Sequence, residues 1–250
     1  MATKVRTLLE LARDMLDRSL VWNHEGLPLS ASIEEGHPRV LVIAGENATG
    51  KSFLAQGLLS WGWHHHEIAP ISVSMRERTG AGRSDMAGMR RLFMFGDESQ
   101  HSTGATSARV VATAFRTLEA RAQEKKRALL ILDEPELGLS DGYAAAMGAY
   151  VASQCLAMPK LACGVAIVTH SRGLVRALAT TLEQLPSFVK TGEAVSFEEW
   201  LKGERTRSVE DLLALPDIDH THWRKMSDIL DELRKPGPTT VSYLRGEPGR

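Results

Sequence analysis

The chain has 250 residues, of which 43% are hydrophobic and 24% are charged. That length is enough to bury one core, with a small appendage. The formal net charge of -1 excludes a global basic field that would attract nucleic acid or an anionic membrane. No apolar run reaches the roughly 18 residues of a transmembrane helix. Cys155 and Cys163 lack metal-site spacing and predict buried thiols in a reducing compartment. A soluble, cytoplasmic protein without a membrane partner is therefore expected.

The first 38 residues predict an N-terminal helix and a cover segment. The apolar residues at helical spacing are Val5, Leu8, Leu9, Ala12, Met15 and Leu16. They indicate a helix that packs on the body rather than one that lies on a membrane surface. Residues 23–38 are turn-rich and are expected to hold a short strand or irregular cover.

Strands and helices alternate over the core, which is expected to span residues 39–192. Predicted strands cover residues 39–45, 70–75, 128–135, 163–171 and 187–192, and predicted helices cover residues 51–63, 104–127, 141–158 and 172–185. Such alternation predicts an α/β fold with a mostly parallel sheet flanked by helices. Residues 193–250 read as a small helical extension, with capping signals at Ser196 and Ser208 and a flexible tail.

Residues 76–101 interrupt this pattern. They are polar, contain several glycines and carry a local excess of arginine. A basic insertion of this kind could contact DNA phosphates, a protein partner or another phosphate-bearing ligand such as a nucleotide, and it could equally be a solvated loop.

The stretch "GENATGKS" at 45–52 lies between a buried strand and a helix. A GxxxxGK[ST] segment in that setting predicts a phosphate cradle made of backbone N–H groups and the helix N-terminus. Gly45 and Gly50 permit the tight turn, Lys51 reaches the β- and γ-phosphates, and Ser52 offers a hydroxyl to Mg²⁺. The expected nucleotide-binding residues of this segment are Gly45, Glu46, Asn47, Ala48, Thr49, Gly50, Lys51, Ser52 and Phe53.

Two other strand ends carry candidate catalytic groups. "ALLILDEP" places Asp133 at the carboxyl end of a buried strand, where open α/β sheets bind ligands. Asp133 is expected to hold Mg²⁺ and Glu134 to polarise the attacking water, although acidic residues there also occur as helix caps. "VAIVTHS" places His170 at the end of another strand, where it could contact the γ-phosphate or orient water.

These motifs, in this order, resemble those of an ABC-type ATPase. "GENATGKS" matches Walker A, "STG" at 102–104 the signature, "LLILDEP" Walker B and "VTHS" the H-switch. The resemblance covers roughly residues 39–192. It implies two nucleotides held between two head-to-tail subunits, with Ser102 and Gly104 facing the γ-phosphate on the partner. The other interpretation of "STG" is an ordinary helix N-cap.

Several departures argue against a transporter subunit. The signature reads "HSTGA" where transporters carry LSGGQ, Ala48 replaces a frequent glycine, and no Q-loop glutamine is evident. Only 82 residues separate Lys51 from Asp133, which leaves room for no more than an abbreviated helical insertion. "DEPELGL" looks instead like the soluble ATPases of the RecF, OLD, SMC-like and anti-phage defence groups.

The sequence therefore predicts an ATPase that uses ATP and Mg²⁺ as a nucleotide-driven dimeric clamp or switch. Its partner would be a second copy or a related ATPase subunit, and DNA-related or defence processes fit the resemblance. Alternatives are an ATP-gated subunit that recruits an effector protein or nucleic acid and, more weakly, a transporter subunit. A small-molecule kinase fits worse, because kinases lack the signature and the strand-end histidine. "HHH" at 64–66 does not predict a metal site, because adjacent histidines on a helix do not converge.

Overall fold

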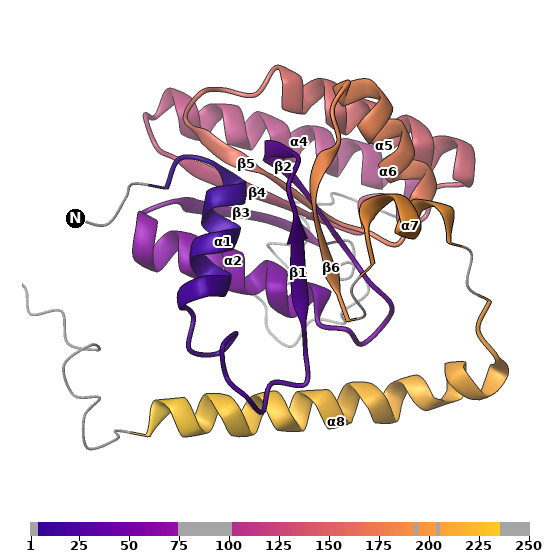
Figure 1. The fold of residues 1–250 in the computed structure, drawn as a ribbon. Coiled ribbons are helices and arrows are strands. Elements are labelled where there is room, and N and C mark those ends of the chain that lie inside the picture. The colour runs from indigo at the N-terminus through magenta and orange to yellow at the C-terminus, as the bar shows by residue number, and fades with distance from the viewer. Residues whose placement is uncertain (1–4, 75–101, 193–194, 204–205, 236–250) are drawn as a thin grey trace, which may run out of the picture.

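The structure is a computed structural model that describes residues 5–74, 102–192, 195–203 and 206–235 (Figure 1). The helices are α1 (Leu8–Arg18), α2 (Lys51–His66), α4 (Thr103–Gln123), α5 (Asp141–Leu156), α6 (Arg172–Leu182), α7 (Phe197–Lys202) and α8 (Val209–Arg234). The strands are β1 (Ala31–Glu34), β2 (His37–Ala44), β3 (Ala69–Ser74), β4 (Ala128–Asp133), β5 (Ala162–Val168) and β6 (Pro186–Thr191). The predicted basic insertion at 76–101 lies outside the described residues.

The six strands form one sheet in the order β1-β6-β2-β5-β4-β3. Every neighbouring pair is parallel except β1 and β6, which pair antiparallel at one edge. The mostly parallel sheet flanked by helices was predicted from the sequence and is confirmed. The interior strands β4 and β5 are buried at every position, as expected for strands covered on both faces.

The direction of each crossover decides which face each helix covers. The chain moves from β2 to β3 in one direction along the sheet, and then returns through β4 and β5 to β6 in the other. Because crossovers between parallel strands are right-handed, α2 must lie on one face and α4, α5 and α6 on the other. The helix α1 joins α2 on its face, where its buried side chains meet Leu41 and Ile43 of β2.

The two faces of β2 show how each layer is packed. Leu41 and Ile43 face α1 and α2, whereas Val40 and Val42 face the layer of α4, α5 and α6. The short helix α7 extends this second layer, since the ring of Phe197 lies edge-on to that of Phe188 with centroids 5.3 Å apart.

Several local predictions are confirmed. The helix α1 packs on the body through an apolar face, and Thr7 caps it with a capping box. Ser196 and Ser208 cap α7 and α8 in the same way. Cys155 and Cys163 are free and buried, and burial raises their thiol pKa values to about 12 and about 11. None of the helices that the structure describes has the length and apolar content needed to span a bilayer.

Several element boundaries differ from the predictions by a few residues. The strand β4 ends at Asp133 because Glu134 adopts a left-handed backbone with φ of 53°. The helix α4 ends at Gln123 rather than at residue 127, and Lys125 also has a positive φ. The strand β5 ends at Val168, so His170 lies two residues beyond it. At both strand ends the predicted strand included polar residues that lie in the following turn.

The helix α8 is long and mostly exposed. It spans 26 residues, includes Pro216, and buries only Met226 and Ile229. In Figure 1 it runs along the side of the molecule on which the parallel strands end. His222 of α8 forms a hydrogen bond to the carbonyl of Ala48, with Nδ1 and O 2.8 Å apart. The C-terminal helix therefore touches the predicted phosphate cradle.

Candidate functional site

The predicted site residues gather at the carboxyl edge of the sheet. Segment 45–52 follows β2, His170 follows β5, and Asp133 ends β4, with β5 lying between β2 and β4. The helices that follow the adjacent strands β2 and β5 lie on opposite faces of the sheet, so the carboxyl ends of these two strands form a topological switch point. Ligands bind open α/β sheets at such a position.

The cradle turn is held by contacts that leave room for no side chain at its first residue. A Cβ on Gly45 would lie 2.2 Å from Oγ1 of Thr191 and 2.6 Å from Oγ1 of Thr49. Those two hydroxyls are 2.7 Å apart and hydrogen-bonded, which ties the turn to the end of β6. Ala48 and Gly50 have φ of 60° and 89°, so the turn uses left-handed backbone twice.

Lys51 is buried inside this turn. Only 4% of its surface is exposed. Its Nζ donates to the carbonyl oxygens of Gly45 at 3.0 Å and Glu46 at 2.7 Å. A buried ammonium needs such partners, because removing a charge from water is costly. The cation therefore lies at the entrance to α2, where the helix N-terminus also favours an anion.

Oxygen groups suited to Mg²⁺ follow the cradle and β4. Ser52 is the second residue of α2, and Asp133 is 8% exposed at the end of β4. The Oγ of Ser74 donates to Oδ2 of Asp133 at 2.9 Å, in keeping with the register that pairs these two residues. Mg²⁺ is usually held by one or two carboxylates together with hydroxyls, phosphates and waters. A serine hydroxyl and one oriented carboxylate fit that preference.

Glu134 and His170 lie beside each other. Oε1 of Glu134 is 3.8 Å from Nε2 of His170, and the Glu134 side chain is only 16% exposed. The left-handed backbone of Glu134 is uncommon for a residue with a Cβ. Its N–H donates to the carbonyl of Val168 at 2.8 Å, so the backbone of one strand end is tied to the other.

A second carboxylate in this region was not predicted as part of the site. Oε1 of Glu136 accepts a hydrogen bond from Oγ1 of Thr169, and that hydroxyl accepts one from the backbone N–H of Ser171 at 2.9 Å. Burial raises the pKa of Glu136, while the bonds from Thr169 and from backbone N–H groups lower it in part. Glu136 and Thr169 thus brace the turn that carries His170.

The described contacts of Ser102 and Gly104, in the signature segment, are with α4 itself and with the turn that follows Glu136, not with the cradle. Ser102 is the N-cap of α4 and accepts from the N–H of Ala105 at 3.3 Å. A Cβ on Gly104 would lie 2.8 Å from Leu139, so α4 begins against the turn that follows Glu136. The N-cap interpretation of "STG" therefore describes its local structure, and the proposed contact with a second subunit stays a prediction.

Other site contacts come from segments far away in the sequence. The ring centroids of Phe53 and Trp22 are 5.5 Å apart. The carboxylate of Glu46 is 3.7 Å from the guanidinium of Arg207. Together with Thr191 and His222, these partners depend on how β6, α8 and the segment before β1 fold back on the cradle. None of the partners Trp22, Thr191, Arg207 and His222 was predicted from the sequence.

The histidine run at 64–66 takes no part in the site. Nε2 of His66 forms a hydrogen bond to Asp14 at 2.9 Å. The largest single influence on the pKa of Asp14 is burial, which raises it. Hydrogen bonds from Arg18, Trp61 and His66 outweigh it and bring the pKa to about 2. Within the part of the chain that the structure describes, no group of three or more potential metal ligands comes together.

Neither models of known protein families nor curated protein sequences match this chain when searched.

Proposed function

We propose that the chain is an ABC-type ATPase that binds and hydrolyses ATP and works as a nucleotide-driven dimeric clamp or switch in the cytoplasm. One observation carries the proposal. A phosphate cradle with a buried lysine, a strand-end aspartate and a strand-end histidine follow β2, β4 and β5, and these strands end at the same edge of one sheet. A glycine-punctuated turn without catalytic use would need neither the buried cation nor the acidic pair.

In this proposal, the cradle binds the phosphates. The backbone N–H groups of 45–52 and the N-terminus of α2 surround the β-phosphate. Lys51 exchanges its two carbonyl partners for phosphate oxygens, so its charge stays compensated throughout. Ser52 and Asp133 would hold Mg²⁺, which when bound neutralises charge on the phosphate oxygens. Ser74 keeps the Asp133 carboxylate oriented.

The acidic and basic groups beyond β4 and β5 would act on the water. The carboxylate of Glu134 accepts a hydrogen bond from the attacking water and aligns it with the γ-phosphate. His170, next to it, donates to a γ-phosphate oxygen. Both groups are on turns just beyond the buried strands β4 and β5.

The proposal is tested by two measurements on Glu134→Gln. The substitution keeps the shape of the side chain but not its charge, so we expect ATP binding to remain and turnover to fall roughly 100- to 10,000-fold. Light scattering should then show a monomer without nucleotide and a dimer with Mg·ATP. Ser102→Arg added to this variant should abolish the dimer, and Glu198→Gln, an exposed glutamate on α7, should behave as wild type.

Two outcomes would overturn parts of the proposal. If wild-type protein releases no phosphate from ATP and Lys51→Ala does not change nucleotide binding, the cradle is no nucleotide site. If Glu134→Gln binds Mg·ATP and stays monomeric, the homodimeric clamp is wrong, and a related ATPase subunit must complete the site.

The contact between α8 and the cradle favours a second candidate, an ATP-gated subunit that recruits an effector. Arg207 contacts Glu46, and His222 contacts Ala48. A nucleotide bound in the cradle would therefore change both contacts. Exposed apolar residues on α8 include Val209, Leu212, Leu213 and Trp223. In this case, amide exchange in α8 should change when ATP binds to Glu134→Gln, without turnover. Unchanged exchange in α8 would exclude the gating.

A further inference from the structure

A basic cavity opens at the edge of the sheet opposite the cradle. It measures about 640 Å³ and lies between the end of α2, the start of β3 and the segment after α4. The strands β3 and β4 begin here at Ala69 and Ala128, whereas the cradle and Asp133 lie beyond the carboxyl ends of the strands. Six residues of β4 separate the two edges by roughly 20 Å. The cavity is therefore a separate site, and its function does not depend on the ATPase proposal.

Positive charge is concentrated in this cavity. The cations that line it are Arg121, Lys125, Lys126 and Arg127. Glu67 also lines it, and Glu124 binds Lys126 at 2.9 Å and Arg121 at 3.1 Å, so cations outnumber carboxylates four to two. The whole chain has a net charge of -1. Such an excess on a nearly neutral chain makes a local field that attracts anions.

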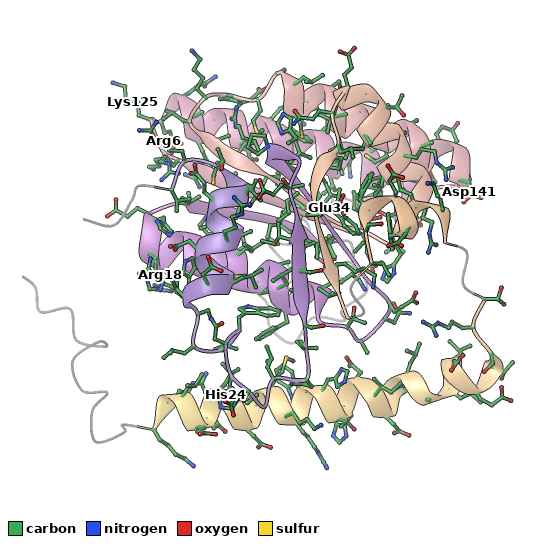
Figure 2. The ribbon with its side chains drawn as sticks, in the orientation of Figure 1. Arg6, Arg18, His24, Glu34, Lys125 and Asp141 are labelled. Carbon is green, nitrogen blue, oxygen red and sulfur yellow. The ribbon has the colours of Figure 1, made fainter. Side chains whose placement is uncertain are left out.

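The rim extends this positive field. Arg127 donates from Nη2 to the carbonyl of Val5, which brings the start of the described chain to the cavity. Figure 2 places Arg6, the next residue, at the same end of the molecule as Lys125. Arg6 is exposed. Its charge therefore adds to that of the cavity.

The dipole of α4 does not account for these cations. Cations close to the carboxyl end of a helix can stabilise it through the helix dipole. In the structure α4 ends at Gln123, and Lys125 has a left-handed backbone in the following turn. The stabilising effect of a helix dipole falls off within the last turn. Three of the four cations lie past that turn, so another reason for their position is needed.

An exposed tryptophan lines the same cavity. Trp63, near the end of α2, leaves 54% of its surface in water although indole is among the most costly groups to expose. Exposed aromatic rings next to basic grooves are the way proteins hold single-stranded nucleic acid, because every base offers a face for stacking. An acidic peptide would use the cations and leave the indole without a role.

We propose that this cavity binds single-stranded nucleic acid. One base stacks on Trp63, and the flanking phosphates bind Arg121, Lys125 and Lys126. The cavity volume lies in the range of about 300–1,000 Å³ that is typical of sites for one small ligand, which suits one splayed nucleotide. Binding of this kind reads no particular sequence, since it uses ring faces and backbone charge.

The test is fluorescence anisotropy of a labelled single-stranded oligothymidine with the full chain, without ATP. Trp63→Ala should raise Kd roughly 5- to 150-fold, which corresponds to the loss of one stacked base. Trp223→Ala is the matched control, because Trp223 is 61% exposed on α8 and is not among the residues that line the cavity. The Kd of this variant should equal that of wild type. Circular dichroism establishes that both variants are folded.

A salt titration tests the phosphate contacts separately. Replacing Lys125 and Lys126 by alanine should lower the slope of log K against log salt by roughly 1.4, which is the loss of two phosphate contacts on a single strand. Lys202→Ala, an exposed lysine on α7, should leave the slope unchanged. The proposal is overturned if the oligothymidine does not bind, if Trp63→Ala binds as wild type does, or if duplex DNA or polyglutamate competes equally well.

Discussion

The hydroxyl of Thr169 connects the turn that carries His170 to Glu136, in the turn after β4. Thr169 is fully buried, donates to Glu136 and accepts from the N–H of Ser171. Thr169→Val keeps the shape and removes both bonds, which should cost about 1–3 kcal/mol in the free energy of unfolding. Denaturant titration measures this. Thr180→Val, whose hydroxyl is exposed and bonds within its helix, should cost less than about 0.5 kcal/mol. Equal costs would show that the Thr169 contacts contribute nothing.

The buried carboxylate of Glu136 should make stability depend on pH. Its pKa is raised from the ordinary value of 4.5, mainly by burial, so the folded protein holds this proton more tightly than the unfolded chain. The contribution of Glu136 to stability is therefore fully present below about 4.5 and is lost as pH rises through the folded pKa. The melting temperature of wild type minus that of Glu136→Gln should increase as pH falls through that window. A difference that increases with rising pH would contradict the assignment.

Some individual site residues were predictable, and others were not. Gly45, Lys51 and Asp133 lie where the sequence placed them, because a motif between a strand and a helix fixes its own geometry. Thr191 and His222 reach the cradle from positions more than 140 residues away, and their contacts depend on sheet order and on the course of α8. Local pattern carries no information on either.

The helices α5 and α6 pack against each other closely at one glycine. A Cβ on Gly148 of α5 would lie 2.0 Å from the carbonyl oxygen of Leu174 of α6. Gly148→Ala must therefore push the helices apart, and we expect a loss of about 1–3 kcal/mol in spite of the better helix propensity of alanine. Thermal unfolding measures this change.

Gly142 offers a matched control in the same helix. A Cβ there meets nothing within 4 Å. Gly142→Ala should therefore be neutral or stabilise by up to about 1 kcal/mol. If Gly148→Ala also stabilises, the two helices are less closely packed than the structure has them.

At the scale of elements, strongly patterned segments were predictable and weakly patterned ones were not. The run "ALLILD" is apolar throughout and forms a fully buried strand. β1 has only four residues, half of them polar and none fully buried, so only its pairing with β6 makes it a strand. In α8, Pro216 lies inside the helix, where sequence rules predict a break. Nothing in the structure explains why the helix continues there.

We expect α8 to detach and unfold before the rest of the molecule does, because it contacts the body at few points. Ile229 is 5% exposed and is one of only two buried residues of this helix. Truncation of a buried isoleucine to alanine costs about 2–5 kcal/mol. That loss is a large part of the free energy with which Met226 and Ile229 can hold α8 on the body. Ile229→Ala should therefore speed amide exchange across 209–234, with β2, β4 and β5 unchanged.

Leu213 provides the comparison for this prediction. It lies on the same helix and is 71% exposed. Leu213→Ala should leave exchange in α8 as it is in the wild type. If Ile229→Ala speeds exchange equally in the sheet and in α8, the whole chain unfolds as one unit.

The position of β2 in the sheet has a consequence for the synthesis of the protein. Both neighbours of this strand come late in the chain, since Val40 pairs with Val165 and Leu41 with Ser187. At about 5–20 residues per second, a ribosome needs roughly 6 to 25 seconds to bring the first of them out. During that interval the apolar strand has no partner and is open to chaperones or to other nascent chains. A polypeptide interrupted before residue 162 would contain the whole of "GENATGKS" and yet lack both strands that pair with β2, the strand from which the cradle follows.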